Sequence, residues 1–379
     1  MNLTPFLVGY GAKTMRRNPI RCFWTNRLWL GVSLVLAPCL VVHAHTFCVT
    51  DASGVQAALT AASDDGSNAA EDNLIEIAAG TYATAGAPFT YSSTSGFALR
   101  VQGGYDAACI MQTQNATLSV LDGGRATQVM HLASTNGLIV ISNLTIRNGS
   151  SHTDGGGLYL NSASASTETK PGIFNTILEN NTTTATGGGF YMHTAGMTRT
   201  YLLTNLIVGN SAGGGYGAGV IDRSSLSITI IDNNTITRNS TTSGNGGGLF
   251  YTNLTGSGYG DCDVENDIFW DNGLASFSTG NGSPATYIGN SVYDVIGGNG
   301  AGEGIDFSTQ SDPLFVDPDA GDFRLGNGSP ALGIASFRIT GFDLEGHPVS
   351  GLIDTSSVDA GAYSDTIFGD AFEATVSFR

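Results

Sequence analysis

Two short motifs recur along this chain at a nearly constant interval, and that interval restricts the folds that the chain can adopt. Groups of glycines followed by apolar residues read GGGLYL, GGGFYM, GAGVID and GGGLFY, and their last glycines are Gly157, Gly189, Gly219 and Gly248. Successive groups lie 32, 30 and 29 residues apart. Self-similarity at such a period indicates a solenoid, a propeller or another repeat array.

Paired asparagines follow the same period and bracket short apolar stretches. Stacked amides form hydrogen-bonded ladders between neighbouring chain segments, so we expect Asn175, Asn205 and Asn234 to form one column. The pairs are Asn143 with Asn148, Asn175 with Asn180, Asn205 with Asn210, Asn234 with Asn239, and Asn266 with Asn272. The residues predicted to fill the interior precede the second asparagine by three positions and are Thr145, Ile177, Ile207, Ile236 and Phe269.

The apolar runs between these motifs are too short for helical repeats. Runs such as LIVIS, LYL and SITII are broken by Gly, Asn, Ser and Thr, which is typical of strands and turns. A propeller blade needs about 40 residues, whereas about 30 residues fit one coil of three short strands. Because each coil pairs with the next, the pattern predicts an all-β fold: a right-handed parallel β-helix, a single-stranded solenoid with about three strands per coil.

The first 44 residues are interpreted as a signal peptide. Five basic residues precede the apolar run LWLGVSLVLAPCLVV, and cleavage is expected near Ala44, with Met15 as an alternative start. We therefore expect the mature protein to be extracellular or on the outer cell surface. No later stretch is apolar enough to cross a membrane, so no transmembrane segment is expected in the mature chain.

The mature chain is divided into three parts by its pattern. Residues 45–72 are predicted to form an N-terminal cap, because a solenoid needs a cover over its first coil. The cap contains an amphipathic helix with Ser53 as N-cap and with Val55 and Leu59 facing inward. Residues 73–340 are assigned to the β-helix, and residues 341–379 to a C-terminal segment and tail.

The net charge and the cysteines indicate which partners the protein can bind and in which compartment it folds. The net charge is −17, and it becomes −22 without the N-terminal segment, which has five basic and no acidic residues. This argues against nucleic acid and anionic membranes as partners and favours cations or neutral glycans. Export permits disulfides, and Cys48 and Cys109 flank the cap, so we expect these two to be bonded. Cys262 is then expected to be a buried free thiol.

Several stretches resemble a known group of proteins. IEIAAGTY, GGY followed by Cys109, and SVLDGG are similar to the start of bacterial secreted right-handed β-helix proteins. The stretch DPLFVDPDAGDFRLGNGSPALGIA, with DLEGHP and DAGAY, resembles the choice-of-anchor Q type C-terminal domain, although His347–Pro348 replaces an arginine often found there. The coils also resemble polymorphic membrane protein repeats and the pectate-lyase-like superfamily. The resemblance implies that the protein is exported and folds as a β-helix. The proteins it resembles include lyases, adhesins and proteins of other roles.

One functional prediction is catalytic. A calcium-dependent, pectate-like lyase needs acidic residues that hold calcium and a basic side chain that removes a proton beside a uronate carboxylate. The candidates are Asp222, Arg223 and Arg238. Asp222 is placed in the repeat position of Leu160, Met192 and Tyr251. Arg238 is placed in the repeat position of Arg147, and an arginine there is also typical of an outward, solvated position. Calcium is the cofactor of this alternative. The aspartates of DPLFVDPDAGD are interpreted as turn formers, with a single calcium site there as the other interpretation.

The other functional prediction is binding. Tyr159, Tyr191, Ile221 and Phe250 follow the last glycine of their group by two residues. Facing outward, they form a stripe spaced by about 4.8 Å that sugar rings can cover; facing inward, they are ordinary cross-coil packing. We predict a glycan-binding or adhesin-like protein, with Tyr159, Tyr191 and Phe250 contacting a polysaccharide or cell-surface glycan. The lyase is the alternative and the enzyme class expected if there is catalysis, and a purely structural surface component is a third hypothesis.

Overall fold

The structure is a computed structural model of the chain. It describes residues 44–164, 170–196, 199–224, 228–253, 262–280, 286–298, 301–335, 341–348 and 358–364. Every described residue belongs to one compact unit, within Val42–Arg379. The predicted signal peptide and the last residues of the tail lie outside the described residues.

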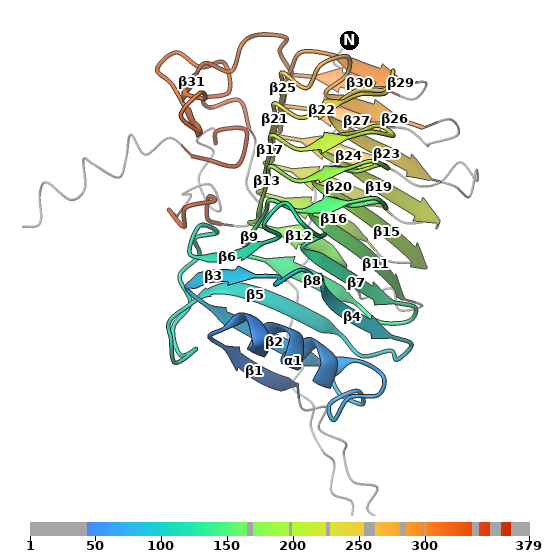
Figure 1. Ribbon diagram of the computed structural model, residues 1–379. Helices are drawn as coiled ribbons and strands as arrows, with labels where there is room; N and C mark the ends of the chain where they lie inside the picture. The colour runs from blue at the N-terminus through green and yellow to red at the C-terminus, as the bar shows by residue number, and fades with distance from the viewer. Residues whose placement is uncertain are drawn as a thin grey trace, which may run out of the picture. The chain divides into compact units, whose positions relative to one another are not determined.

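The described chain winds into coils that stack along one axis and build four parallel sheets (Figure 1). Sheet 1 contains β1 (His45–Val49), β2 (Asn73–Ala78), β5 (Leu99–Tyr105), β8 (Ile139–Ser142), β12 (Gly172–Phe174), β16 (Thr200–Leu203), β20 (Thr229–Asp232), β24 (Cys262–Glu265), β27 (Thr286–Gly289) and β30 (Ala301–Asp306). Sheet 2 contains β3 (Gly80–Ala83), β6 (Ser119–Asp122), β9 (Thr145–Arg147), β13 (Ile177–Glu179), β17 (Leu206–Val208), β21 (Thr235–Thr237), β25 (Ile268–Trp270) and β28 (Val292–Tyr293).

The other two sheets complete each coil. Sheet 3 contains the short strands β10 (Ser150–Ser151), β14 (Thr182–Thr183), β18 (Ser211–Ala212) and β22 (Ser240–Thr241). Sheet 4 contains β4 (Phe89–Ser93), β7 (Met130–Ser134), β11 (Leu158–Ser164), β15 (Phe190–Gly196), β19 (Gly219–Ser224), β23 (Leu249–Asn253), β26 (Phe277–Thr279) and β29 (Ile296–Gly298). The predicted all-β parallel β-helix is therefore confirmed.

Alternation of side chains places the core inside the coils. In β4, FTYSS, buried and exposed residues alternate, because successive side chains of a strand point to opposite faces. The central column of sheet 2 is formed by Ile146, Leu178, Ile207, Ile236 and Phe269, each at most 1% exposed. The predictions for Ile207, Ile236 and Phe269 are thus confirmed. Those for Thr145 and Ile177 are wrong by one residue, so these two side chains point out of the coil.

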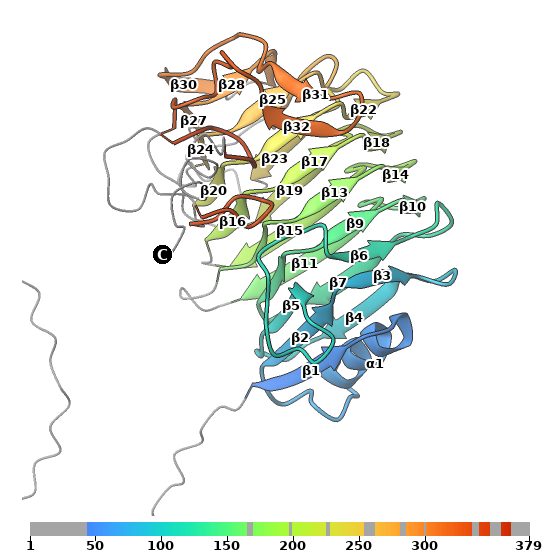
Figure 2. The same cartoon turned by 90° about the vertical axis from the view of Figure 1, so that its left-hand side faces the viewer.

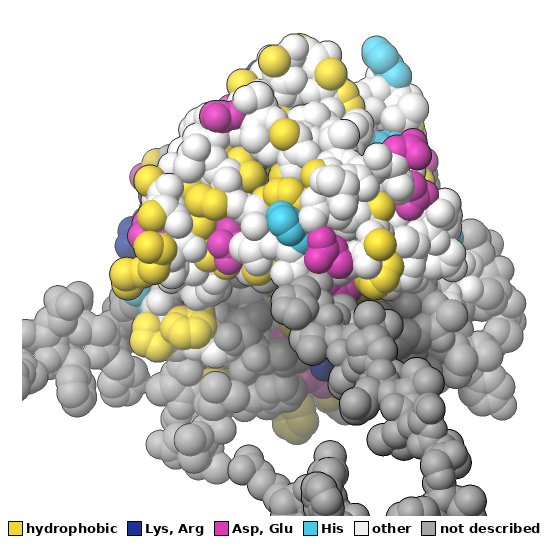
Figure 3. Space-filling model, turned by 90° about the horizontal axis from the view of Figure 1, so that it is seen from below, with side chains coloured by type: hydrophobic (Ala, Val, Ile, Leu, Met, Phe, Trp, Pro, Cys, Tyr) yellow, Lys and Arg dark blue, Asp and Glu magenta, His cyan; other side chains and the backbone are white. Residues whose placement is uncertain are grey.

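The N-terminal cap consists of β1 and the helix α1 (Ala52–Ala62). Val55 and Leu59 are fully buried against the first coil, as predicted. The N-cap is Asp51, not Ser53: its carboxylate accepts a hydrogen bond from the N–H of Gly54 at 2.8 Å. A carboxylate is favoured there because its charge also opposes the helix dipole. Seen from this end, the surface carries small, separated hydrophobic groups among polar and acidic side chains (Figure 3).

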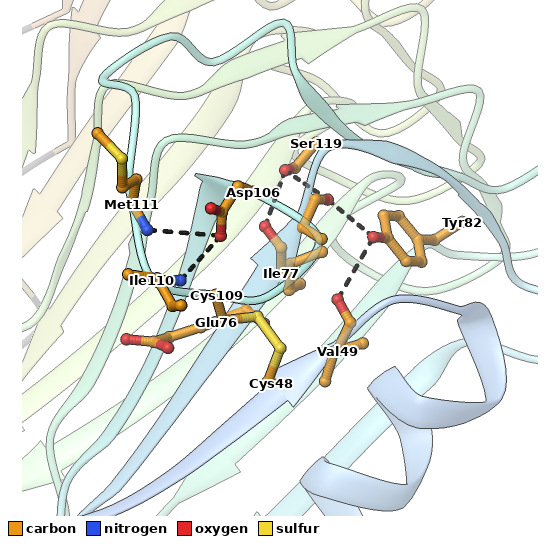
Figure 4. The surroundings of a disulfide bond; sticks show 11 residues. Cys48, Val49, Glu76, Ile77, Tyr82, Asp106, Cys109, Ile110, Met111 and Ser119 are labelled. Atoms are coloured by element: carbon orange, nitrogen blue, oxygen red, sulfur yellow. Dashed lines mark hydrogen bonds between the residues drawn. A yellow bond between two sulfur atoms is a disulfide. The ribbon is translucent and has the colours of Figure 1, made fainter.

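A disulfide joins the cap to the first coil. Cys48 in β1 is bonded to Cys109 in the loop that follows β5, as predicted from the sequence (Figure 4). The same loop is closed by Asp106, whose carboxylate accepts from the N–H of Ile110 at 2.8 Å. Cys262 is a buried free thiol, also as predicted.

Asparagines do form a ladder inside the turn between sheets 1 and 2. Nδ2 of Asn205 donates to Oδ1 of Asn234 at 2.9 Å, and Nδ2 of Asn234 donates to Oδ1 of Asp267 at 2.9 Å. Asn175 lies outside this column, contrary to the prediction, and donates to Oδ1 of Asn143 at 2.9 Å instead. Thr176 takes the ladder position of that coil, and its N–H donates to Asn205 at 2.9 Å.

A second ladder follows sheet 2. It runs through Asn181, Asn210, Asn239 and Asn272, whose side-chain amides are joined at 3.0, 3.0 and 2.9 Å. The residue just before each ladder residue has a positive φ, and before Asn181 it is Asn180, at 55°. Asparagine is among the few residues that adopt this left-handed conformation readily. Asparagine is thus favoured at two adjacent places of each turn, for two different reasons.

Asp267 is an acid in a column of neutral residues, and it predicts a pH-dependent stability. Its Oδ1 accepts from the N–H and Nδ2 of Asn234, whereas its buried Oδ2 has no hydrogen-bond partner among the described residues. Burial raises the pKa of Asp267 well above its ordinary value. In the ladder above, Nδ2 of Asn205 donates to the carbonyl of Ile173 and Nδ2 of Asn234 to that of Leu202. By this register an amide at 267 would donate to the carbonyl of Ile231.

Asp267→Asn is therefore expected to raise the free energy of unfolding at pH 7 by about 1–3 kcal/mol. The unfolded acid ionises near pH 4 and the folded one at higher pH. The contribution of Asp267 to stability is therefore fully present below pH 4 and is lost as pH rises through the folded pKa. Urea unfolding from pH 4 to 8 measures this, and the variant should flatten that dependence. The exposed Asp65→Asn should change stability by at most about 0.5 kcal/mol. An equal loss of stability in Asp267→Asn at all pH values would contradict the prediction.

The C-terminal part packs against the outer face of sheet 2. After β30 the chain forms an antiparallel hairpin of β31 (Phe315–Asp317) and β32 (Asp322–Leu325), which Figure 2 shows in front of the upper strands of sheet 2. Ile177 and Leu206, which point out of the coil, are buried there against Phe323, Leu344 and Ala362. This explains why an outward position of sheet 2 is apolar. The boundary at residue 340 stays a prediction.

Candidate functional site

The outer face of sheet 4 carries a continuous column of side chains. Each belongs to the residue next to a core residue along its strand. Strand register aligns His131, Tyr159, Tyr191, Val220 and Phe250 in successive strands from β7 to β23. Four of the five are half-buried, and Val220 is 4% exposed. The predicted outward stripe is thus present at Tyr159, Tyr191 and Phe250, and we call the column from His131 to Phe250 the sheet 4 stripe.

One predicted member of the stripe is wrong. Ile221 is fully buried in the core column, and Val220 takes its place outside. The prediction assumed that the last glycine of each group has the same place in its coil. In this coil Gly219 pairs with Phe190, a core residue, and not with Gly189. A Cβ at Gly219 would collide with the ring of Phe190, so the larger ring of one coil fills the space left by the next.

The first three rings of the stripe are stacked. The ring centroids of His131 and Tyr159 are 4.3 Å apart with planes 8° apart, and those of Tyr159 and Tyr191 are 5.8 Å apart with planes 3° apart. Farther along, Phe250 stacks on Tyr216 at 4.1 Å. The coil spacing of about 4.8 Å holds flat rings at stacking distance. The result is a row of half-buried, stacked aromatic rings that follows the axis of the β-helix.

Asp222 meets the stripe at Tyr191. It pairs with His193 and Thr252, so it points outward, and its predicted register with Leu160 and Met192 is wrong by one residue. Its Oδ2 accepts a hydrogen bond from the Tyr191 hydroxyl at 2.9 Å and lies 3.1 Å from Nδ1 of His193. The Asp222 side chain is only 10% exposed. A carboxylate, a phenol and an imidazole therefore converge beside the stacked rings.

Electrostatics at this site is dominated by acidic groups. Burial, and then the negative charge of Asp222, raise the pKa of Tyr191. Burial raises the pKa of Tyr159 as well, with Asp154 and Asp222 adding to the shift. Burial lowers the pKa of His131, so its ring is neutral at pH 7. Both phenols are therefore neutral hydrogen-bonding groups under ordinary conditions.

Arg223, a predicted catalytic residue, lies inside the β-helix. It is 0% exposed, and one of its guanidinium nitrogens donates to Oγ1 of Thr229 at 2.9 Å. The same contact exists one coil earlier between Thr194 and Thr200, at 2.8 Å. Burial lowers the pKa of this guanidinium. Arg223 and Asp222 are neighbours in sequence but point to opposite sides of sheet 4.

Arg238, the other predicted basic residue, holds the C-terminal hairpin. Its guanidinium donates to the carbonyl of Pro318 and to Oδ1 of Asp319, both at 2.6 Å, and it lies over the ring of Phe323. It also lines an open depression of about 410 Å³ beside the second ladder, together with Asp271. Arg147 pairs with Glu179 in sheet 2, one position earlier in the repeat than Arg238. The structure does not bring Arg238 to the sheet 4 stripe.

A second group of polar side chains lies in the C-terminal part. Asp343, Glu345 and His347 place three possible metal-ligating atoms within 4.8 Å of one another. Asp343 is already used by the loop itself: Oδ1 accepts from the backbone N–H groups of Glu345 and His347 at 3.0 and 2.8 Å. This arrangement is that of a side chain that closes a turn.

Several residues of the site carry no signal that sequence alone reveals. His131 precedes the first glycine group, so no repeat motif marks it as the first ring of the stripe. His193 and Asp222 are 29 residues apart and become neighbours only through strand pairing. The period of the glycine groups would predict that contact only if the one-residue shift of register at Gly219 were known.

Comparisons of the chain with protein-family models, with curated proteins and with solved structures found no match. In the described part of the chain, no helix combines the length and the apolar character that crossing a membrane requires. The fold and the geometry of the sheet 4 stripe therefore carry the functional argument.

Proposed function

We propose that the protein is an exported, adhesin-like β-helix that binds a glycan chain along the sheet 4 stripe. The observation that carries this proposal is the stack of His131, Tyr159 and Tyr191, three half-buried residues with parallel ring planes on the outer face of sheet 4. Aromatic faces offer flat apolar area that covers the C–H face of a sugar ring. The stack follows the axis of a straight solenoid, which suits an extended, chain-like ligand.

Polar groups beside the rings supply the second requirement of sugar binding. Tyr191, His193 and Asp222 meet within hydrogen-bond distance at the edge of the stripe. Binding sites combine apolar faces with a few well-placed polar groups that fix the ligand's orientation. The outer face of sheet 2 does not offer such a site where the C-terminal part covers it.

Tyr159→Ala combined with Tyr191→Ala is expected to weaken glycan binding by at least about 30-fold, because two stacking surfaces are lost. A glycan array identifies the ligand, and titration calorimetry on wild type and variant measures the loss. Phe174→Ala, which removes a ring from a stacked pair on sheet 1, is the control and should bind as the wild type does. Unchanged affinity in the double variant, or no binding on a broad array, would contradict the proposal.

A calcium-dependent polysaccharide lyase is the alternative function. The same protein, incubated with polyuronates and calcium, would then form unsaturated product that absorbs ultraviolet light. Its predicted basic residues lie apart from the stripe, because Arg223 is enclosed in the core and Arg238 contacts the hairpin. Steady product formation that Arg238→Ala abolishes would favour the lyase.

Export is part of the proposal. The disulfide between Cys48 and Cys109 is of the kind that forms in oxidising compartments. The predicted cleavage near Ala44 would leave both of these cysteines in the mature protein. The mass and the N-terminal sequence of the protein recovered from the culture medium or the cell surface test this directly.

A further inference from the structure

Two carboxylates raise the negative charge around the stacked tyrosines. Asp154 and Asp222 both act electrostatically on Tyr159 and on Tyr191. Asp154 lies in the turn before β11 and is fixed by Thr186, whose N–H and hydroxyl donate to Oδ1 at 3.1 and 2.7 Å. Asp222 approaches from β19. Among the residues that the structure describes, no Lys or Arg is one of the charged groups that act on either of these two phenols.

Asp222 is a buried carboxylate with incomplete partners. Its side chain is 10% exposed, and both hydrogen-bonding neighbours, the hydroxyl of Tyr191 and Nδ1 of His193, contact the same oxygen, Oδ2. The other oxygen, Oδ1, is buried and has no hydrogen-bond partner among the described residues. A buried carboxylate without full compensation stabilises a cation brought close to it.

The aromatic rings favour a cation at the same place. The face of a phenol ring carries negative potential, so an ammonium group over it is attracted, most strongly where water is excluded. The rings of Tyr159 and Tyr191 lie parallel at 5.8 Å and belong to the half-buried part of the stripe. His131, the next ring, is neutral at pH 7 because burial lowers its pKa, so it does not repel a cation there.

These observations deepen the proposed function and rest on it. We propose that the sheet 4 stripe recognises a glycan with free, protonated amino groups, with an ammonium over the Tyr191 ring, close to Asp222 and attracted also by Asp154. Sugar rings cover the aromatic faces, and the two carboxylates select the charged amine over its neutral, N-acetylated counterpart. The net charge of −17 steers such a polycation toward the protein.

The test compares two probes of equal length and linkage, β-1,4-linked glucosamine oligomers and the fully N-acetylated oligomers. Titration calorimetry is performed at low and at high salt, at a pH that keeps the amine protonated. The wild type is expected to bind the amine form roughly ten-fold or more tightly than the acetylated form. This preference should shrink at high salt, because screening weakens the attraction between charges.

Asp222→Asn and Asp154→Asn are the informative variants, because asparagine keeps the shape and the accepting oxygen while removing the charge. Each is expected to lose most of the preference for the amine. Asp154→Asn should also keep its affinity for the acetylated oligomer, because Asp154 is not one of the polar groups that meet beside the rings. Asp65→Asn makes the same change in net charge in the N-terminal cap and should keep the preference. Circular dichroism and the melting temperature confirm that the variants fold.

The outcomes separate this inference from the proposed function. Equal or tighter binding of the acetylated oligomer, lost in Tyr159→Ala with Tyr191→Ala, would overturn the amine preference and leave glycan binding at the stripe intact. A preference for the amine that survives in both aspartate variants would also overturn it. Absence of binding to both oligomers and to a glycan array would reject the inference and the proposed function together.

Discussion

Replacing Asn210 by alanine is expected to lower the free energy of unfolding by about 4 kcal/mol. Asn210 is fully buried, and its side chain joins three coils. Its Nδ2 donates to the carbonyl of Leu178 at 2.8 Å and to Oδ1 of Asn239 at 3.0 Å, while its Oδ1 accepts from the N–H and the Nδ2 of Asn181 at 2.9 and 3.0 Å. Alanine leaves buried donors and an acceptor unpaired, which is the costly case.

Asn180→Gly is the matched control for this change. Asn180 is exposed, has a φ of 55° and immediately precedes the ladder residue Asn181. Glycine adopts that conformation without strain, and the next coil already has Gly209 with a φ of 65° just before Asn210. The control should change stability by at most about 0.5 kcal/mol. Urea unfolding followed by circular dichroism measures both variants, and a loss below about 1 kcal/mol for Asn210→Ala would mean that the ladder contributes little.

Removing the disulfide by Cys48→Ala with Cys109→Ala is expected to cost about 4 kcal/mol. The bond closes a loop with a sequence separation of 61 residues, and a longer loop loses more freedom in the unfolded chain. It ties β1, which carries the cap helix, to the loop after β5 (Figure 4). We therefore expect the cap to loosen first, with faster proteolysis in the exposed stretch Ile110–Met111.

The reduced wild type is the control for the disulfide variant. A reductant should lower the melting temperature of the wild type to that of the double variant and leave the variant unchanged, because Cys262 is the only other cysteine in the described part of the chain. Equal melting temperatures of the oxidised wild type and the variant would show that the bond does not stabilise the cap.

The sequence predicted the fold because the period of its motifs is a physical requirement of stacked coils. Side chains of one coil pack directly on those of the next, so the same residue types recur at each place. The N-terminal cap and its inward residues Val55 and Leu59 followed from the need to cover the first coil. The disulfide followed from the expected export and from the positions of Cys48 and Cys109 beside the cap. Local composition was sufficient for each of these features.

Register within the turns could not be predicted because asparagine fulfils two roles at adjacent places. Asn180 has the left-handed backbone, and Asn181 belongs to the ladder. In the preceding turn of the same coil, Asn175 has the left-handed backbone and Thr176 holds the ladder position. A motif that counts asparagines cannot distinguish the two places, so the predicted column was displaced by one residue at Asn175.

The site was predicted in part, for a similar reason. Tyr159, Tyr191 and Phe250 follow glycines that keep their register, so the glycine count aligned them correctly with one another. Whether this position faces outward or inward was left open, and the structure places it on the outer face. Gly219 occupies a core position because the ring of Phe190 fills the space beside it. Because of this cross-coil packing, the predicted positions of Ile221 and Asp222 were wrong by one residue. The contact between Asp222 and His193 became visible only in three dimensions.

A crystal structure of the protein with a bound oligosaccharide tests the central claim most directly. The account predicts sugar rings stacked over Tyr159 and Tyr191, with polar groups of the ligand beside His193 and Asp222. A ligand seated instead in the depression near Arg238, or on the outer face of sheet 1, would contradict the assignment of the sheet 4 stripe as the binding surface.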